Sequence, residues 1–170
     1  MCQSWRTVAM KLYHGSNIVV AHPEVAKGKP FKDFGQGFYL SDSIEQAMEM
    51  AERVAEREGA AQTPIISTFE FDESAMTDGS LNVKCFGSYT EEWAEFVLRN
   101  RDRKTPQPFH DYDIVYGPIA DDSVVRQMRR FEMGSITLKE LMRELQYPPK
   151  ITFQYFFGSE KALEKLKFLC

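Results

Sequence analysis

The sequence predicts an α+β fold, with antiparallel or mixed sheets, in a single domain. Strand-like runs interleave with amphipathic helical segments, but without the regular alternation and Gly-rich turn of a doubly wound parallel fold. The chain has 170 residues, of which 43% are hydrophobic, and this is enough for one core. No repeat or low-complexity tract marks a domain boundary. We therefore expect one domain over residues 1–170, with residues 1–10 as a loose leader.

Strands are expected where short aromatic or β-branched runs lie between turn residues. These runs are residues 11–13, 38–40, 65–71, 112–116 and 151–157. The connection over residues 16–30 contains two Pro and a Gly, and its length suggests a flap over a ligand rather than a tight hairpin. The stretch from Asp72 to Gly87 is expected to consist of turns.

Helices are expected where a capping residue precedes apolar positions at helical spacing. The first is capped by Ser41 or Ser43 and ends at Gly59. The second helix runs from Thr90 to about Asn100, and the third runs from Ser123 to Glu132 and ends at Gly134. The fourth runs from Leu138 to Leu145, with Thr137 as its cap and with Pro148 and Pro149 after its end. The last is capped by Ser159 and contains Ala162, Leu163, Leu166 and Leu169.

Composition excludes several classes of protein. The net charge of −4 argues against a general nucleic-acid-binding surface, although one local basic face remains compatible with it. No apolar run approaches 18 residues, and the N-terminus lacks the apolar stretch of a secretion signal, so we expect no membrane association and a cytoplasmic location. The few cysteines and histidines are scattered, which predicts neither a disulfide framework nor a metal site. They are Cys2, Cys85, Cys170, His14, His22 and His110.

Two short motifs near the start of the chain place polar and Gly residues within strand-like runs. They are Leu12–Ser16 (LYHGS) and Phe34–Ser41 (FGQGFYLS). His14 offers a hydrogen-bond donor and an acceptor, Gly15 permits close approach, and Tyr39 has an aromatic face suited to a planar ligand. Two strands lining a cleft for a flat, polar ligand would explain this combination. A strand-end His bonded to a carbonyl, and a Tyr that belongs to the core, remain the structural alternatives.

Each of several further polar residues or groups has both a functional and a structural interpretation. Gln154 lies within an aromatic strand and faces either solvent or a site. The acidic residues could form a metal site, but helix N-termini and turns account for them more simply. The basic residues could guide phosphates or belong to solvated helix faces. The acidic set is Asp111, Asp113, Asp121 and Asp122, and the basic set is Arg126, Arg129, Arg130 and residues 99–104.

Together these motifs resemble the His-Tyr-Glu pattern of the ADP-ribosyltransferase superfamily, in its diphtheria-toxin and poly(ADP-ribose) polymerase branch. The matching stretches are Leu12 to Ser16, Gly35 to Ser41, Glu95 to Arg101, Asp111 to Asp121 and Gln154 to Leu166. The chain is more narrowly similar to a bacterial family of small uncharacterised domains placed in that superfamily. This resemblance implies split antiparallel or mixed sheets flanked by helices, NAD as a substrate and no metal.

The resemblance also implies a role for each matching residue. His14 would bond the ribose of the adenosine half of NAD, and the backbone of Gly15 would hold the nicotinamide carboxamide. Tyr39 would stack on nicotinamide, and Gln154 would stand where the family has its glutamate. Ser16, Gly37 and Ser41 complete the expected NAD site. Related genes act with a small partner protein in toxin–antitoxin fashion, so a small antitoxin-like partner and a protein or nucleic-acid acceptor are expected.

Two departures from the family pattern bear on activity. Gln154 can orient a ribose hydroxyl but supplies no negative charge, which makes synthesis of poly(ADP-ribose) chains improbable. Three options remain: a mono-ADP-ribosyltransferase, an enzyme that borrows Asp113 or Glu70, and a non-catalytic NAD-binding or protein-interaction module. Ala47 and Met50 replace a Ser and a second Tyr of polymerase-like members, so a more open pocket is expected on that side.

Overall fold

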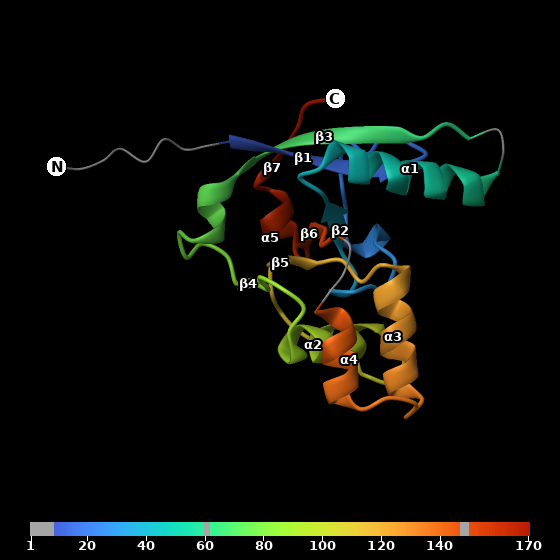
Figure 1. Cartoon of the computed structure of the whole chain (residues 1–170). Coiled ribbons are helices and arrows are strands. Elements are labelled where there is room, and N and C mark those ends of the chain that lie inside the picture. Colours follow the sequence, from blue (N-terminus) through green and yellow to red (C-terminus); the bar gives the residue numbers. More distant parts are fainter. Residues whose placement is uncertain (1–8, 60–61, 147–149) are drawn as a thin grey trace.

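The structure is a computed structural model that describes residues 9–59, 62–146 and 150–170. It is a single α+β domain, as expected, and Figure 1 shows its elements in sequence colours. Within the described residues the strands are β1 (Ala9–Ser16), β2 (Phe38–Leu40), β3 (Ile65–Asp72), β4 (Val83–Cys85), β5 (Ile114–Pro118), β6 (Phe153–Phe157) and β7 (Leu166–Phe168). The helices are α1 (Ile44–Glu58), α2 (Glu91–Arg101), α3 (Asp122–Glu132), α4 (Leu138–Leu145) and α5 (Glu160–Leu163).

The strands form two sheets, so the expected split is confirmed. One sheet has the order β1-β3-β7 and is antiparallel throughout. The other has the order β2-β6-β5-β4, in which only the β4–β5 pair is parallel. A single bridge between Tyr13 of β1 and Ser41, directly after β2, joins the two sheets. Figure 1 shows α1 alongside β1 and β3, whereas α2, α3 and α4 gather at the opposite end.

The alternation of side chains along β6 divides the core into two clusters. Phe156 packs with Phe34, Trp93 and Val115 in the cluster that α2, α3 and α4 cover. Phe157 packs in the second cluster, with Leu12 and Phe69. The β2–β6 pair is therefore buried on both faces, and residues on its two faces belong to different environments.

Helix α1 begins where the capping chemistry of the sequence predicts. Ser43 is its N-cap, with the Ser43 hydroxyl accepting the Gln46 N–H, and Gly59 follows its last turn at a φ of 121°. The small residues Ala47, Ala51 and Ala55 form its buried face. They allow the helix to lie close against β1, where a Cβ added to Gly15 would be 1.9 Å from the Ala47 carbonyl oxygen. The absence of a side chain at Gly15 is thus required by packing.

Several sequence-based boundaries are wrong. Residues 83–85 form β4, although residues 72–87 were expected to be turns, because parallel pairing with β5 is a long-range contact. The last helix stops at Leu163, and Leu166 and Phe168 lie instead in β7, where they pack beside Phe69. Helical and strand spacing coincide over so short an apolar run. Ala9 and Met10 belong to β1 rather than to a leader, whereas residues 1–8 and the pair Pro148–Pro149 lie outside the described residues.

Candidate functional site

The point where β1 and β2 diverge brings two of the expected site residues together. The Tyr13 N–H donates to the Ser41 carbonyl at 2.7 Å, and the Ser41 N–H donates to the Tyr13 carbonyl at 2.9 Å. A continuing antiparallel ladder would pair Gly15 with Tyr39 next. Instead, Nδ1 of His14 bonds the Tyr39 carbonyl oxygen at 2.8 Å. The imidazole thus occupies the acceptor that the next rung of the ladder would use.

This arrangement leaves the main chain of Gly15 facing the split. Successive residues of a strand direct their backbone groups to alternate sides, so Gly15 directs its N–H and C=O to the side of Tyr13, away from β3. Among the described residues, no hydrogen bond from the β2 side reaches these two groups. A donor and an acceptor therefore lie next to each other at the end of the Tyr13–Ser41 bridge.

The hydrogen bond of His14 defines its tautomer. A carbonyl oxygen only accepts, so Nδ1 carries the proton, and Nε2 of the neutral ring is an acceptor. Burial lowers the pKa of His14 below its ordinary value, and the bond to Tyr39 opposes this only in part, so the neutral form is favoured. The ring also packs against Phe38, with 4.4 Å between centroids. The structural alternative of a strand-end His bonded to a carbonyl is therefore what is observed, and Nε2 remains available to a ligand.

Tyr39 is fixed by its hydroxyl group. The hydroxyl donates to the Gly35 carbonyl at 2.7 Å and accepts the Phe34 N–H at 3.0 Å. The half-buried ring packs beside Phe34 and Phe156. Burial, aided by the negative charge of Asp33, raises the pKa of Tyr39 well above its usual range. Tyr39 therefore anchors the preceding loop, and only its ring remains for contact with a ligand.

The other expected NAD-site residues have local structural partners. A Cβ added to Gly37 would lie 2.4 Å from the Phe156 ring, so this glycine allows β2 to approach β6. The Ser41 hydroxyl accepts the Ser43 N–H at 3.0 Å and donates to the Gln46 side chain at 3.1 Å, which stabilises the start of α1. The Ser16 hydroxyl donates to Asn17. Their role in binding NAD stays a prediction.

Gln154 lies on the strand next to β2. The pairing of Leu40 with Tyr155 places Gln154 opposite Ser41, on the same face as Tyr39 and at about 7–8 Å on the diagonal. His14, by alternation, leaves β1 toward the other face, with Phe38. The three expected residues therefore occupy adjacent strands in the expected order. His14 meets Tyr39 only through its backbone carbonyl, and Gln154 makes its hydrogen bond elsewhere.

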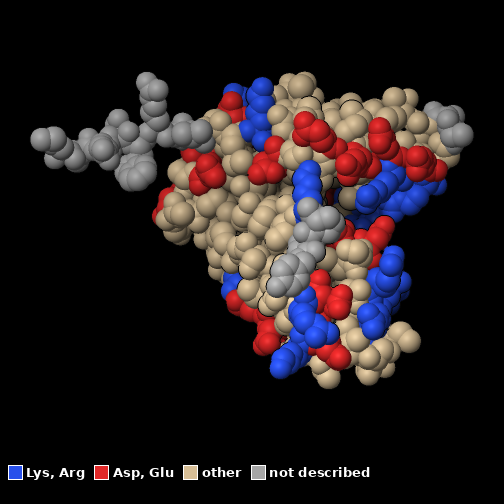
Figure 2. All heavy atoms as spheres, viewed as in Figure 1, with Lys and Arg blue, Asp and Glu red and all other residues tan. Residues whose placement is uncertain are grey.

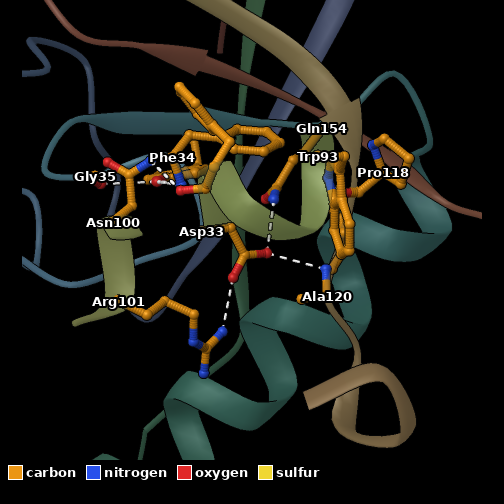
Figure 3. A network of polar contacts seen from close by, with 12 residues as sticks. Asp33, Phe34, Gly35, Trp93, Asn100, Arg101, Pro118, Ala120 and Gln154 are labelled. Atoms are coloured by element: carbon orange, nitrogen blue, oxygen red, sulfur yellow. Dashed lines mark hydrogen bonds and ion pairs between the residues drawn. The ribbon is translucent and has the colours of Figure 1, made fainter. Parts of the chain in front are cut away.

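That bond goes to Asp33, a residue that the sequence analysis missed. Asp33 as a whole residue is only 7% exposed, and three groups surround its carboxylate (Figure 3). Oδ1 accepts from Arg101 at 2.7 Å, whereas Oδ2 accepts from the Ala120 N–H at 3.0 Å and from Nε2 of Gln154 at 3.1 Å. The only sequence signal was an acidic residue directly before the aromatic, Gly-rich motif. Arg101, expected to be part of a solvated helix end, points inward instead.

The loop that carries Asp33 is held on further sides. Nε2 of His110 bonds the Phe34 carbonyl at 2.7 Å, and Nδ1 of the same ring accepts the Tyr112 N–H. Burial lowers the pKa of His110. Asn100 packs beside Gly35, whose φ of 100° favours glycine. These contacts hold the loop in place between β2 and α2.

The carboxylates expected as substitutes for a glutamate lie elsewhere. Asp113 accepts the Asn82 N–H at 2.7 Å and the Ser159 hydroxyl at 2.6 Å. It precedes Ile114, at the end of β5 away from the Gly117–Gln154 pair, so four residues of strand, or about 13 Å, separate it from Gln154. Glu70 is on β3 of the other sheet and pairs with Lys167. Neither Asp113 nor Glu70 is therefore placed to substitute for a glutamate at position 154.

Asp121 of the acidic set serves as a helix cap, and the arginines of α3 face solvent. Asp121 caps α3 by accepting the N–H groups of Ser123 and Val124, and those hydrogen bonds hold its pKa low despite partial burial. No group of three or more potential metal ligands occurs in the described part of the chain. Arg126, Arg129 and Arg130 are exposed on α3. Figure 2 shows basic atoms on the side of α1 that faces α3, with acidic atoms close by, so this face lacks a surface of one sign.

Two surface hollows lie away from these residues. One of 260 Å³ lies between the loop at Ala21–Pro23 and the segment at Glu160–Leu166. Another, of 300 Å³, lies at the end of α1 near Gly59. Among the described residues, every helix is too short or too polar to span a bilayer.

The fold and the site define a small α+β domain with a split sheet, a His at the split whose neutral form is favoured, and a buried Asp that bonds a partly buried Gln beside it. The chain belongs to a family described as protein of unknown function (DUF3990), whose sequence profile matches residues 10–168. The match covers all seven strands and all five helices described above except Ala9. No curated protein matches the chain.

Proposed function

We propose that the protein is an NAD-dependent mono-ADP-ribosyltransferase that modifies a macromolecule. The observation that supports this most directly is the interrupted ladder between β1 and β2. Within the part of the chain that the structure describes, it leaves the N–H and C=O of Gly15 without a partner on the β2 side. A primary carboxamide, such as that of nicotinamide, carries one acceptor and two donors and complements such a pair. A ligand bound at this point would contact the main chain of Gly15, so it must approach the backbone closely.

The neighbouring groups suit the remainder of the ligand. Nε2 of His14 is an unprotonated acceptor for a ribose hydroxyl. The Tyr39 ring, held by its hydroxyl, provides a flat surface beside the split. Gln154, on the adjacent strand, contributes a side-chain carbonyl oxygen. These roles follow the resemblance of the motifs to the ADP-ribosyltransferase superfamily.

In the proposed reaction the bond between the nicotinamide nitrogen and ribose C1′ breaks, and its electron pair leaves with nicotinamide. A nucleophile of the acceptor forms the new bond to C1′ and releases its proton to solvent. The transition state is oxocarbenium-like, as in glycoside hydrolysis, and the enzyme must orient the sugar while positive charge develops. Gln154 orients without adding charge, so we expect a rate lower by about 10²–10³ than that of a glutamate enzyme. Transfer of single ADP-ribose groups is compatible with this.

A second candidate is an NAD-binding or protein-interaction module without catalysis, possible partners including a small antitoxin-like protein. The environment of Gln154 favours it. Asp33, whose carboxylate contacts Gln154, is already paired with Arg101, so it offers no free negative charge to a ligand beside Gln154. This candidate predicts binding without release of nicotinamide.

Isothermal titration with NAD tests the proposal. The wild type is expected to bind, and His14→Ala to bind at least tenfold more weakly through the loss of one ribose contact. His22→Ala is the matched control, because His22 is exposed on the connection between β1 and β2 and is not among the residues expected to contact NAD. The absence of NAD binding in the wild type contradicts the proposal. Release of nicotinamide that disappears in Gln154→Ala separates the enzyme from the binding module.

A further inference from the structure

The partly buried contact between Asp33 and Gln154 determines which way the Gln154 amide faces. A carboxylate oxygen only accepts hydrogen bonds, so the atom of Gln154 at 3.1 Å from Oδ2 of Asp33 must be the amide nitrogen. The amide oxygen Oε1 then points away from Asp33. It makes no hydrogen bond within the described residues, and it is not among the buried side-chain atoms that lack a partner. It is therefore open to a ligand.

Asp33 is itself held firmly enough to act as an anchor. Arg101, at the end of α2, bonds Oδ1, and the Ala120 N–H, after β5, bonds Oδ2 (Figure 3). These contacts join the loop before β2 to segments 68 and 87 residues away along the chain. The negative charge of Asp33 is compensated by Arg101 and is not available as a catalytic base. Its remaining hydrogen-bonding capacity is directed at Gln154.

From this geometry we infer that Asp33 is a positioning residue, which orients Gln154 so that its amide oxygen Oε1, rather than its amide nitrogen, faces the ligand and accepts a hydrogen bond from a ligand hydroxyl. The inference rests on the proposed function for the identity of that hydroxyl, the ribose of the nicotinamide half of NAD. A freely rotating glutamine would serve donors and acceptors equally. The anchored glutamine selects ligands with a hydroxyl group at this point.

The same contact explains why a glutamine, rather than a glutamate, is compatible with this site. A carboxylate at position 154 would face the Asp33 carboxylate at about the present distance of 3.1 Å. Two carboxylates so close cannot both ionise without a large cost, and one would remain protonated. Glutamine at 154 and aspartate at 33 therefore form a matched pair. Exchanging the two functional groups should restore a hydrogen bond between positions 33 and 154, although an amide nitrogen at 33 then replaces the oxygen that accepts the Ala120 N–H.

A double-mutant cycle on stability tests the pairing without any ligand. Gln154→Glu is expected to lower the melting temperature by about 5 °C or more at pH 7. In Asp33→Asn/Gln154→Glu, the amide at 33 can donate to the carboxylate at 154, so the double variant should be more stable than the sum of the two single losses predicts. Asp42→Asn, on an exposed aspartate, and Gln127→Glu, on α3, are the matched controls, expected to change the melting temperature by less than about 1 °C. Single effects that simply add in the double variant overturn the inference.

Binding measurements test the orientation of the ligand-facing oxygen. Asp33→Ala, which removes the acceptor of the Gln154 amide nitrogen, is expected to weaken NAD about tenfold and to leave the affinity for nicotinamide alone unchanged, because nicotinamide has no ribose for Oε1 to contact. A general loss of structure would weaken both ligands equally and would overturn the positioning role. If the wild type binds neither ligand, the proposed function fails, whereas the stability cycle still decides whether Asp33 orients Gln154.

Discussion

Asp33 and Arg101 form an ion pair, with 2.7 Å between Oδ1 and Nη1, that fastens the loop before β2 to the end of α2. The Asp33 side chain is nearly buried, whereas Arg101 remains about one-third exposed. The pair therefore differs from the ion pair of Arg99 with Glu95, in which both side chains are exposed on α2.

Arg101→Ala is expected to destabilise the protein by about 2 kcal/mol, because it leaves a buried carboxylate without its charged partner. The measurement is urea unfolding at pH 7. Arg99→Ala, from the same helix turn, provides the comparison and should cost less than about 1 kcal/mol, as exposed ion pairs do. Equal losses in the two variants would show that the Asp33 carboxylate does not depend on Arg101.

Gly15→Ala is expected to destabilise the fold by about 3 kcal/mol or more. Its Cβ would lie 1.9 Å from the Ala47 carbonyl and 2.8 Å from the Ala51 nitrogen, both of which are helix backbone that cannot rotate away. Gly87→Ala is the control, since a Cβ there meets nothing within 4 Å. Thermal unfolding of both variants measures the difference. A melting temperature for Gly15→Ala equal to that of Gly87→Ala would refute the close packing of α1 on β1.

Tyr39→Phe separates the anchoring role of Tyr39 from its proposed stacking role. Removal of the hydroxyl leaves the Phe34 N–H and the Gly35 carbonyl without this partner, so a loss of about 1–3 kcal/mol is expected. The ring is retained, so NAD affinity should change less than in Tyr39→Leu. Unfolding and titration with NAD measure the two effects. The stacking role is wrong if Tyr39→Leu, still folded, binds NAD as well as Tyr39→Phe.

Stability is expected to fall as the pH decreases through 6.5. His14 and His110 have pKa values lowered by burial, so below the ordinary value of 6.5 the unfolded chain binds more protons than the folded one. The free energy of unfolding therefore rises with pH in this range, and the histidine contribution is fully present above 6.5. Urea unfolding at pH 7.5, 6.5 and 5.5 measures the slope. His14→Gln and His110→Gln should each reduce it, whereas His22→Gln should not.

Much of the secondary structure could be predicted because its signals are local. The hydroxyls of Ser43, Thr90 and Thr137 each accept an N–H three residues further on, and the helices begin directly after these residues. Alternation along residues 65–71 likewise predicts a strand that is half buried. The short strands β4 and β7 escaped prediction because their existence depends on partners far along the chain.

The candidate site likewise has features that the sequence predicts and features that depend on long-range contacts. The sequence by itself determined the α+β class and the order of His14, Tyr39 and Gln154 on separate strands, since residue type and periodicity carry this information. Only the tertiary structure decided that His14 bonds the Tyr39 carbonyl, that Gly15 faces the split and that Asp33 orients Gln154. Asp33 meets Gln154 across 121 residues of chain. A contact of that kind arises from the packing of a loop, a helix end and a strand, and no local pattern encodes it.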